Sequence, residues 1–194
     1  VVYIFVGSRM GFGALKLWAM GRLKQEFPRY EYQKQRWLAA GKANVPLAMQ
    51  VDALWQGLAN ASFLAMPAFV IAANSSEHIH ALEIIGLLVW VGAFSMESFA
   101  DMQKLSFLRA MKKAGEKNRV CNVGLWKYSR HPNYFAEQGF WLTFYLFSVA
   151  ASGQWINWSI AGAVLLVILF RGSSSFSEEI SASKYPQYAR YQET

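Results

Sequence analysis

The 194-residue sequence has one cysteine, Cys121, and few charged residues. A lone cysteine cannot form a disulfide within the chain, so disulfide bonds cannot stabilise this fold. Charged residues make up 16% of the chain and hydrophobic residues 54%, whereas typical soluble domains are about a quarter charged. These proportions argue against a water-soluble domain and against disorder, and they favour a membrane protein.

Five apolar segments are candidates to cross the bilayer, whose hydrocarbon core of ~30 Å takes ~20 helical residues. Only Ser152, Gly153 and Gln154 separate the last two segments, which predicts a tight helical hairpin. We therefore expect an all-α, multi-pass transmembrane bundle of about five spans, forming one domain over residues 1–194. The apolar start at Val1, without a Met, is also expected of a chain that lacks earlier helices. The five segments cover about residues 1–21, 48–73, 79–100, 135–151 and 155–170.

Acidic residues are also scarce, with 12 Asp and Glu against 19 Lys and Arg. Seventeen of the basic residues lie in 22–42, in 104–130 or after residue 170, whereas the connections 74–80 and 152–154 contain none. Basic residues accumulate on the cytoplasmic side of membrane proteins. We expect the basic segments to face the cytoplasm and to meet anionic lipid headgroups or an anionic cofactor rather than nucleic acid.

Two carboxylates, Glu97 and Asp101, lie four residues apart at the end of the third segment and so share one helical face. Ionisable groups at such a depth are functional candidates. The alternative is an interfacial helix end with a local pair between Asp101 and Lys104.

A dense polar motif, GLWKYSRHPNYFAE, occupies residues 124–137 at the start of the fourth segment. Pro132 predicts a helix start there, and the free N–H groups of a helix start attract anions. Arg130 is suited to a phosphate and Asn133 to a planar amide, while Glu137 lies one turn deeper on the same face. The alternative is an amphipathic segment that Trp126 and Tyr128 anchor at the membrane surface.

The C-terminal region repeats this pattern more weakly, with Arg171, the pair Glu178-Glu179, and three tyrosines. Tyr185, Tyr188 and Tyr191 could pack over an adenine ring, although a solvated tail would also explain them. His78 and His80 are two residues apart, which is the wrong spacing for a shared metal site on a helix, so no metal is expected.

The motif of residues 124–137 resembles the signature of bacterial membrane proteins related to steroid 5α-reductase. This superfamily also includes sterol C14-reductases and, more distantly, isoprenylcysteine carboxyl methyltransferases. Residues 101–104, the segment from Arg29 to Trp37, and Arg171, Glu179 and Tyr185 support the resemblance. Ala136, where the family usually has Gly, and residues 172–175 depart from the family pattern.

The resemblance implies a 3-oxo-5α-steroid 4-dehydrogenase-like enzyme of lipid metabolism in a bacterial inner membrane. Such an enzyme binds NADPH in a cytoplasm-facing pocket, here within residues 97–194, and reduces the C=C bond of a hydrophobic enone. The family's carbonyl-polarising residues lie on more N-terminal helices, so no catalytic residue is assigned. The expected cofactor-binding residues are Glu97, Asp101, Arg119, Trp126, Tyr128, Arg130, His131, Asn133, Glu137, Arg171 and Glu179.

Two other functions are open from the sequence. The first is a membrane methyltransferase that uses S-adenosylmethionine, because the Arg-His-Pro-x-Tyr pattern of residues 130–134 also occurs in that class. NADPH carries several phosphate charges that would require Arg119, Arg130 and Arg171 together, whereas S-adenosylmethionine carries none. The second is a non-catalytic membrane scaffold, which would bind neither cofactor. Substrate identity and oligomeric state are not readable from the sequence.

Overall fold

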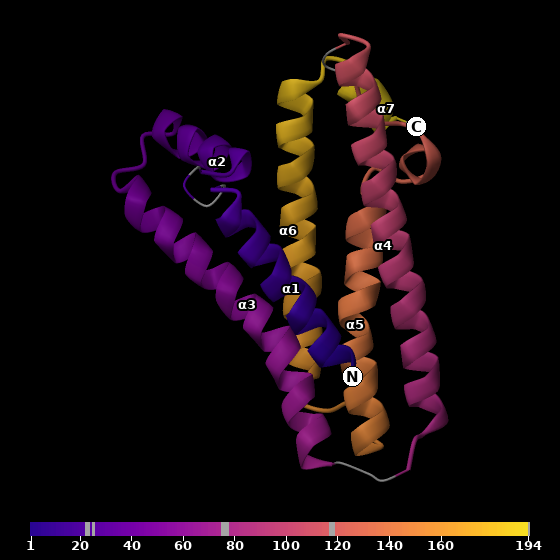
Figure 1. The fold of residues 1–194 in the computed structure, drawn as a ribbon. Coiled ribbons are helices and arrows are strands. Elements are labelled where there is room, and N and C mark those ends of the chain that lie inside the picture. Colours follow the sequence, from indigo (N-terminus) through magenta and orange to yellow (C-terminus); the bar gives the residue numbers. More distant parts are fainter. Residues whose placement is uncertain (22–23, 25, 75–77, 117–118, 194) are drawn as a thin grey trace. The chain divides into compact units, whose positions relative to one another are not determined.

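The fold of the chain is taken from a computed structural model, which describes residues 1–21, 24, 26–74, 78–116 and 119–193. The expected all-α class is confirmed: the described residues form helices and contain no strand (Figure 1). The basic residues Arg22 and Lys117 of the predicted topology lie outside the described residues. The elements are α1 (Val2–Ala19), α2 (Pro28–Ala39), α3 (Val45–Ala73), α4 (Ala81–Lys113), the 3-10 turn η2 (Gly124–Lys127), α5 (Pro132–Ser152), α6 (Ile160–Lys184) and α7 (Tyr188–Gln192).

The chain divides into two compact units, residues 1–50 and 51–194. The first unit contains α2, a helix that the sequence analysis did not predict in the first basic loop. Pro28 opens this helix, and Gln35 Nε2 donates a hydrogen bond of 2.7 Å to Glu31 one turn earlier. Local polar pairs of this kind stabilise a helix that buries none of its residues.

Three helices are long and apolar enough to cross a membrane: α3, α4 and α6. Their outer faces expose large apolar side chains, such as Leu54, Leu88 and Ile168, which suit contact with lipid better than contact with water. These helices indicate an integral membrane protein.

The expected count of five spans is therefore too high. Arg9 and Lys16 interrupt α1, and α5 carries Glu137 and Gln138. Instead, α5 packs against both α4 and α6 and buries Phe140 and Phe144 between them. A helix that other helices cover needs less hydropathy than one surrounded by lipid.

The second unit is held together by aromatic and small residues. Phe140 of α5 packs against Trp90 of α4, with ring centroids 5.4 Å apart, and Phe63 of α3 clusters with Leu166 of α6. At Gly162 of α6, a Cβ would lie 2.9 Å from the Phe63 Cα, so only glycine permits this approach of α3 and α6.

Two helices extend beyond the predicted spans. The 33-residue α4 continues to Lys113, thirteen residues past the predicted end of its span, and α6 continues to Lys184 rather than ending near Phe170. The predicted hairpin between α5 and α6 is present, with Gly153 in the left-handed conformation at the end of α5 (φ +67°). These extensions carry polar residues of α4 and α6 beyond the apolar segments and build the candidate site.

Candidate functional site

The motif of residues 124–137 contains the predicted helix start. Pro132 is the first residue of α5, His131 precedes it as the N-cap, and the Phe135 N–H donates to the His131 carbonyl at 3.0 Å. Asn133 and Glu137 therefore lie one turn apart on the same helix, as the spacing predicts.

The turn η2 is fixed to α4 by two hydrogen bonds. The Trp126 indole donates to the Ala100 carbonyl at 2.8 Å, and the Leu125 N–H donates to Gln103 Oε1 at 2.9 Å. Gly124 has a φ of +56°, and a Cβ there would collide with the Gln103 side chain. Trp126 is only 3% exposed, so its indole anchors η2 to α4.

Glu178 of α6 joins three parts of the structure. Its Oε1 lies 3.1 Å from Arg130 Nε and 3.3 Å from His131 Nε2, and its Oε2 accepts a hydrogen bond of 3.2 Å from Gln192 Nε2. Burial lowers the pKa of His131, and the hydrogen bond between His131 and the Glu178 carboxylate partly opposes that effect. Glu178 therefore holds the start of α5 against α6 and α7.

An amide and a carboxylate meet between α4 and α5. Asn133 Nδ2 donates to Asp101 Oδ1 at 3.2 Å, while Asn133 Oδ1 is buried and accepts no hydrogen bond from the described residues. Glu97 lies one turn before Asp101, and Glu137 Oε1 accepts a hydrogen bond of 3.4 Å from the Trp141 indole. A buried acceptor without a donor is costly, and a ligand N–H group would satisfy it.

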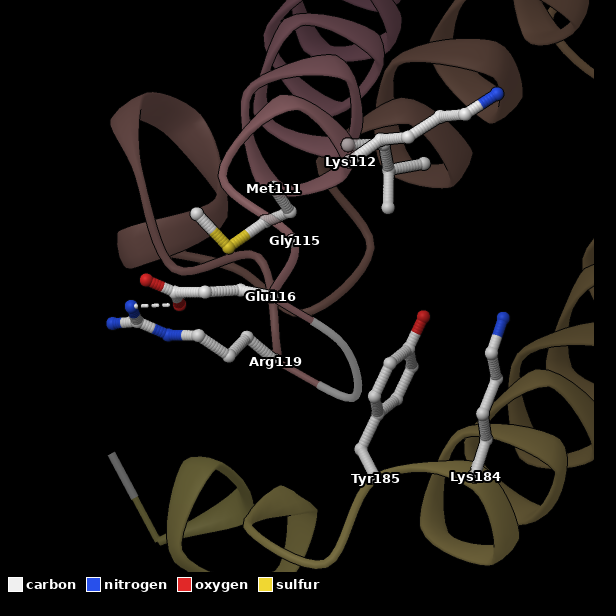
Figure 2. Close-up of a pocket in the computed structure, with 8 residues that line it drawn as sticks. Met111, Lys112, Gly115, Glu116, Arg119, Lys184 and Tyr185 are labelled. Carbon is white, nitrogen blue, oxygen red and sulfur yellow. Dashed lines mark hydrogen bonds and ion pairs between the residues drawn. The ribbon is translucent and has the colours of Figure 1, made fainter.

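A first pocket, of about 310 Å³, lies where α4 and α6 end (Figure 2). Glu116 and Arg119 come from the segment after α4 and form an ion pair of 2.6 Å. Lys112, Lys184 and Arg119 place three cations around the pocket against the one carboxylate of Glu116. The remaining lining residues are Leu108, Met111, Gly115 and Tyr185.

A second pocket, of about 360 Å³, lies beside η2 and shares no lining residue with the first. Tyr128 is 85% exposed on this turn. The lining residues are Trp126, Lys127, Tyr128, Ser129, Arg130, Tyr191 and Gln192.

The structure brings together only some of the predicted site residues. It joins Asp101 to Asn133 and Arg130 to His131, but Arg119 lines the first pocket, Arg130 lines the second, and Arg171 is exposed on α6. The three arginines expected to meet cofactor phosphates thus lie at three different places. Glu179 is exposed on α6.

The three C-terminal tyrosines lie in different environments. Tyr185 lines the first pocket, whereas Tyr188 is 4% exposed and the Tyr191 hydroxyl donates to the Trp126 carbonyl. Burial is the main reason why the pKa of Tyr191 rises to about 12. Of the three rings proposed to cover an adenine, Tyr185 lines the first pocket and Tyr191 the second.

Three charged residues of this region were not among the expected cofactor-binding residues: Lys112, Glu178 and Lys184. Lys112 lies eleven residues after Asp101, which is three helical turns along the same face, so helical spacing could have selected it. No local signal distinguishes Glu178 from Glu179, because which of the two contacts the start of α5 depends on which face of α6 meets α5. Among the described residues, no group of three or more His, Cys, Asp and Glu side chains is placed to hold a metal ion.

The comparisons with known proteins agree with a membrane protein of this kind. The chain is 33% identical to the uncharacterized protein C594.04c of the fission yeast Schizosaccharomyces pombe, in an alignment of 146 positions that covers 67% of the chain. The alignment spans 42% of that relative, so the chain covers less than half of its length. No solved structure matches the chain significantly. The family model described as "Protein of unknown function (DUF1295)" matches residues 11–194, so the chain belongs to this family, which is associated with steroid 5α-reductase-like membrane proteins.

Proposed function

We propose that this protein is a membrane-embedded reductase that uses NADPH to reduce the C=C bond of a lipid-like enone, such as a steroid 3-oxo-4-ene. The observation that carries the proposal is the buried Asn133 Oδ1, which lacks a donor among the described residues while its amide nitrogen is held by Asp101. The carboxamide of a nicotinamide ring offers an N–H group that fits this acceptor. The family's association with steroid 5α-reductase-like membrane proteins is in keeping with this proposal.

The first pocket suits the phosphates of such a cofactor. Asp101, Lys104, Leu108 and Lys112 are spaced by three or four residues and so follow one face of α4 from Asn133 to this pocket. At about 1.5 Å per residue, Asp101 and Lys112 are ~16 Å apart along the helix. This length suits an extended dinucleotide with its carboxamide at Asn133.

The charges and aromatic ring of the first pocket suit a cofactor whose carboxamide lies at Asn133 and whose phosphates and adenine lie in this pocket. Lys112, Arg119 and Lys184 would neutralise phosphate groups, and the Tyr185 ring offers a flat surface for adenine. Lys104 interacts electrostatically with both Asp101 and Lys184, so it would extend the positive potential toward the middle of the cofactor.

The reaction divides its tasks between the cofactor and the protein. When bound, NADPH would supply the hydride that the β-carbon of the enone accepts, and solvent would supply the proton that the α-carbon takes up. Asn133 and Asp101 would orient the carboxamide and thereby fix which face of the ring meets the substrate. The lipid-like substrate would enter from the bilayer that surrounds α3, α4 and α6.

The first test is a binding titration of the detergent-purified protein with NADPH and, separately, with S-adenosylmethionine. We expect saturable NADPH binding that Asn133→Ala weakens about 5- to 150-fold, the effect of losing one hydrogen bond to a buried group. Glu137→Gln should also weaken binding. Gln138→Ala is the matched control, because this amide is on the same helix and, among the described residues, donates to the Tyr134 carbonyl alone.

The second test uses salt to detect the phosphates. NADPH affinity should fall as ionic strength rises, since partly exposed charge pairs are screened over ~8–10 Å. Arg119→Gln should weaken binding and flatten that dependence, and Arg119→Lys should rescue it only in part. Saturable binding of S-adenosylmethionine without NADPH binding would instead identify a methyltransferase, and binding of neither would contradict the proposal.

A further inference from the structure

The second pocket lies at the depth of a membrane surface. The Trp126 indole bonds the Ala100 carbonyl and the Leu125 N–H bonds Gln103, which places η2 beside a point 19 to 22 residues from the start of α4 at Ala81. At about 1.5 Å per residue, this point is ~30 Å along the helix, which is the thickness of the hydrocarbon core. The pocket therefore sits where lipid headgroups begin if α4 spans the bilayer.

The residues at this depth combine a cation with an aromatic ring. Lys127 has no acidic partner among the described residues, whereas Arg130 is already paired with Glu178 and donates to the Gln192 carbonyl at 3.2 Å. Tyr128, next to Lys127, is 85% exposed. Tyrosine rings and lysine ammonium groups are enriched at the membrane surface, where the ring reaches the acyl boundary and the cation meets phosphate.

We propose that the second pocket binds the phosphate headgroup of an anionic phospholipid, with Lys127 and the outer edge of Arg130 facing the phosphate and Tyr128 lying among the lipid chains. Ser129 and Gln192 line the pocket and offer polar groups to the headgroup. The proposal is independent of the proposed reductase activity, because the first and second pockets share no lining residue and Asn133 lines neither.

The bound lipid would have a structural consequence for the neighbouring helices. Tyr191 of α7 donates a hydrogen bond to the Trp126 carbonyl of η2, and Glu178 ties Gln192 to Arg130. A headgroup in this pocket would therefore contact both η2 and α7 and hold the C-terminal helix at the membrane surface.

The test is native mass spectrometry of the full chain, purified in detergent and titrated with dioleoylphosphatidylglycerol or with zwitterionic dioleoylphosphatidylcholine. We expect one phosphatidylglycerol to remain bound at concentrations where phosphatidylcholine does not. Lys127→Gln should weaken its binding about fivefold, the contribution of one basic residue near an anionic surface. Tyr128→Ala should weaken it as well, and Lys127→Arg should restore it.

The matched control is Lys112→Gln, which removes one positive charge at the first pocket and should leave phosphatidylglycerol binding unchanged. Lys127 and Tyr128 are exposed, so their replacement does not disturb packing, and an unchanged melting temperature would verify this. The proposal is overturned if Lys127→Gln and Tyr128→Ala both bind phosphatidylglycerol like the parent, or if Lys112→Gln weakens it equally. Displacement of the lipid by millimolar inorganic phosphate would reassign the pocket to a soluble phosphate, and displacement by NADPH would reassign it to the cofactor.

Discussion

The two ends of α5 are both polar, but they differ in how well their polar groups are satisfied. At the end near Ser152, Ser148 and Ser159 are fully buried, and their hydroxyl groups are 2.9 Å apart. Asn157 Oδ1 accepts from the Ser159 hydroxyl at 2.6 Å, and its amide nitrogen donates to Ser148 at 3.3 Å. At the other end, Asn133 Oδ1 is buried without a donor among the described residues.

This difference separates a structural cluster from a candidate binding site. A buried polar group that has all its partners rigidifies the fold, whereas one that lacks a partner marks a place where a ligand can supply it. The Ser148, Asn157 and Ser159 cluster closes the loop between α5 and α6 and leaves little for a ligand to bind. At the opposite end of the same helix, the unsatisfied Asn133 Oδ1 is a candidate ligand-binding group that can be tested.

The largest expected effect concerns the sides of the membrane on which the two ends lie. In a Cys121→Ser background, we expect a cysteine at Gln154 to react with an impermeant maleimide only from outside the cell. A cysteine at Lys127 should react only from the cytoplasmic side, because 17 of the 19 Lys and Arg residues lie in segments assigned to that side. Labelling of both positions from the same side would contradict this topology.

Next in size is the loss of the satisfied cluster. Asn157→Ala removes one hydrogen-bond partner of Ser148 and of Ser159 and takes away the acceptor of the buried Ser159 N–H, so unfolding should become easier by about 2 kcal/mol. Denaturant unfolding in detergent measures this change. The protein that remains folded should bind NADPH with the parent's affinity, and a selective loss of NADPH binding would show that this end also serves the ligand.

A smaller change in stability is expected at the other end. Asn133→Ala removes an acceptor that has no donor, along with one hydrogen bond to Asp101, so its stability should change by less than about 1 kcal/mol. The same unfolding measurement, run beside Asn157→Ala, tests the contrast between the two ends. If Asn133→Ala destabilised the protein as much as Asn157→Ala, Asn133 would belong to the fold rather than to a binding site.

The smallest expected effect is the change of folding stability with pH. Burial lowers the pKa of His131 below its ordinary value of 6.5, so the unfolded chain binds the proton more readily than the folded one. The stability contributed by neutral His131 should be fully present above pH 6.5 and should be lost as the pH falls through the lowered pKa. A series of melting temperatures between pH 5 and 7.5 measures it, and His131→Gln should flatten the change in that interval.

Much of the helical arrangement was predictable because its signals are local. The apolar segments predicted helices at or near α1, α3, α4, α5 and α6, and Pro132 predicted the start of α5. The count of spans was not predictable in the same way, since an apolar segment such as α5 can be covered by other helices, here α4 and α6, as well as by lipid. The helix α2 was missed because its residues are mostly polar and none is buried, so the segment was interpreted only as a basic loop between apolar spans.

The sequence by itself determined which chemical groups stand near the membrane surface: the carboxylates of α4, the motif around His131 and the basic segments. Only the tertiary structure decided how they combine. It paired Arg130 with Glu178 and placed it in a different pocket from Arg119. It also buried Asn133 Oδ1 next to Asp101, which is 32 residues away in the chain. Helical periodicity places a residue on a face of its own helix, but the packing of α4, α5 and α6 decides which faces meet.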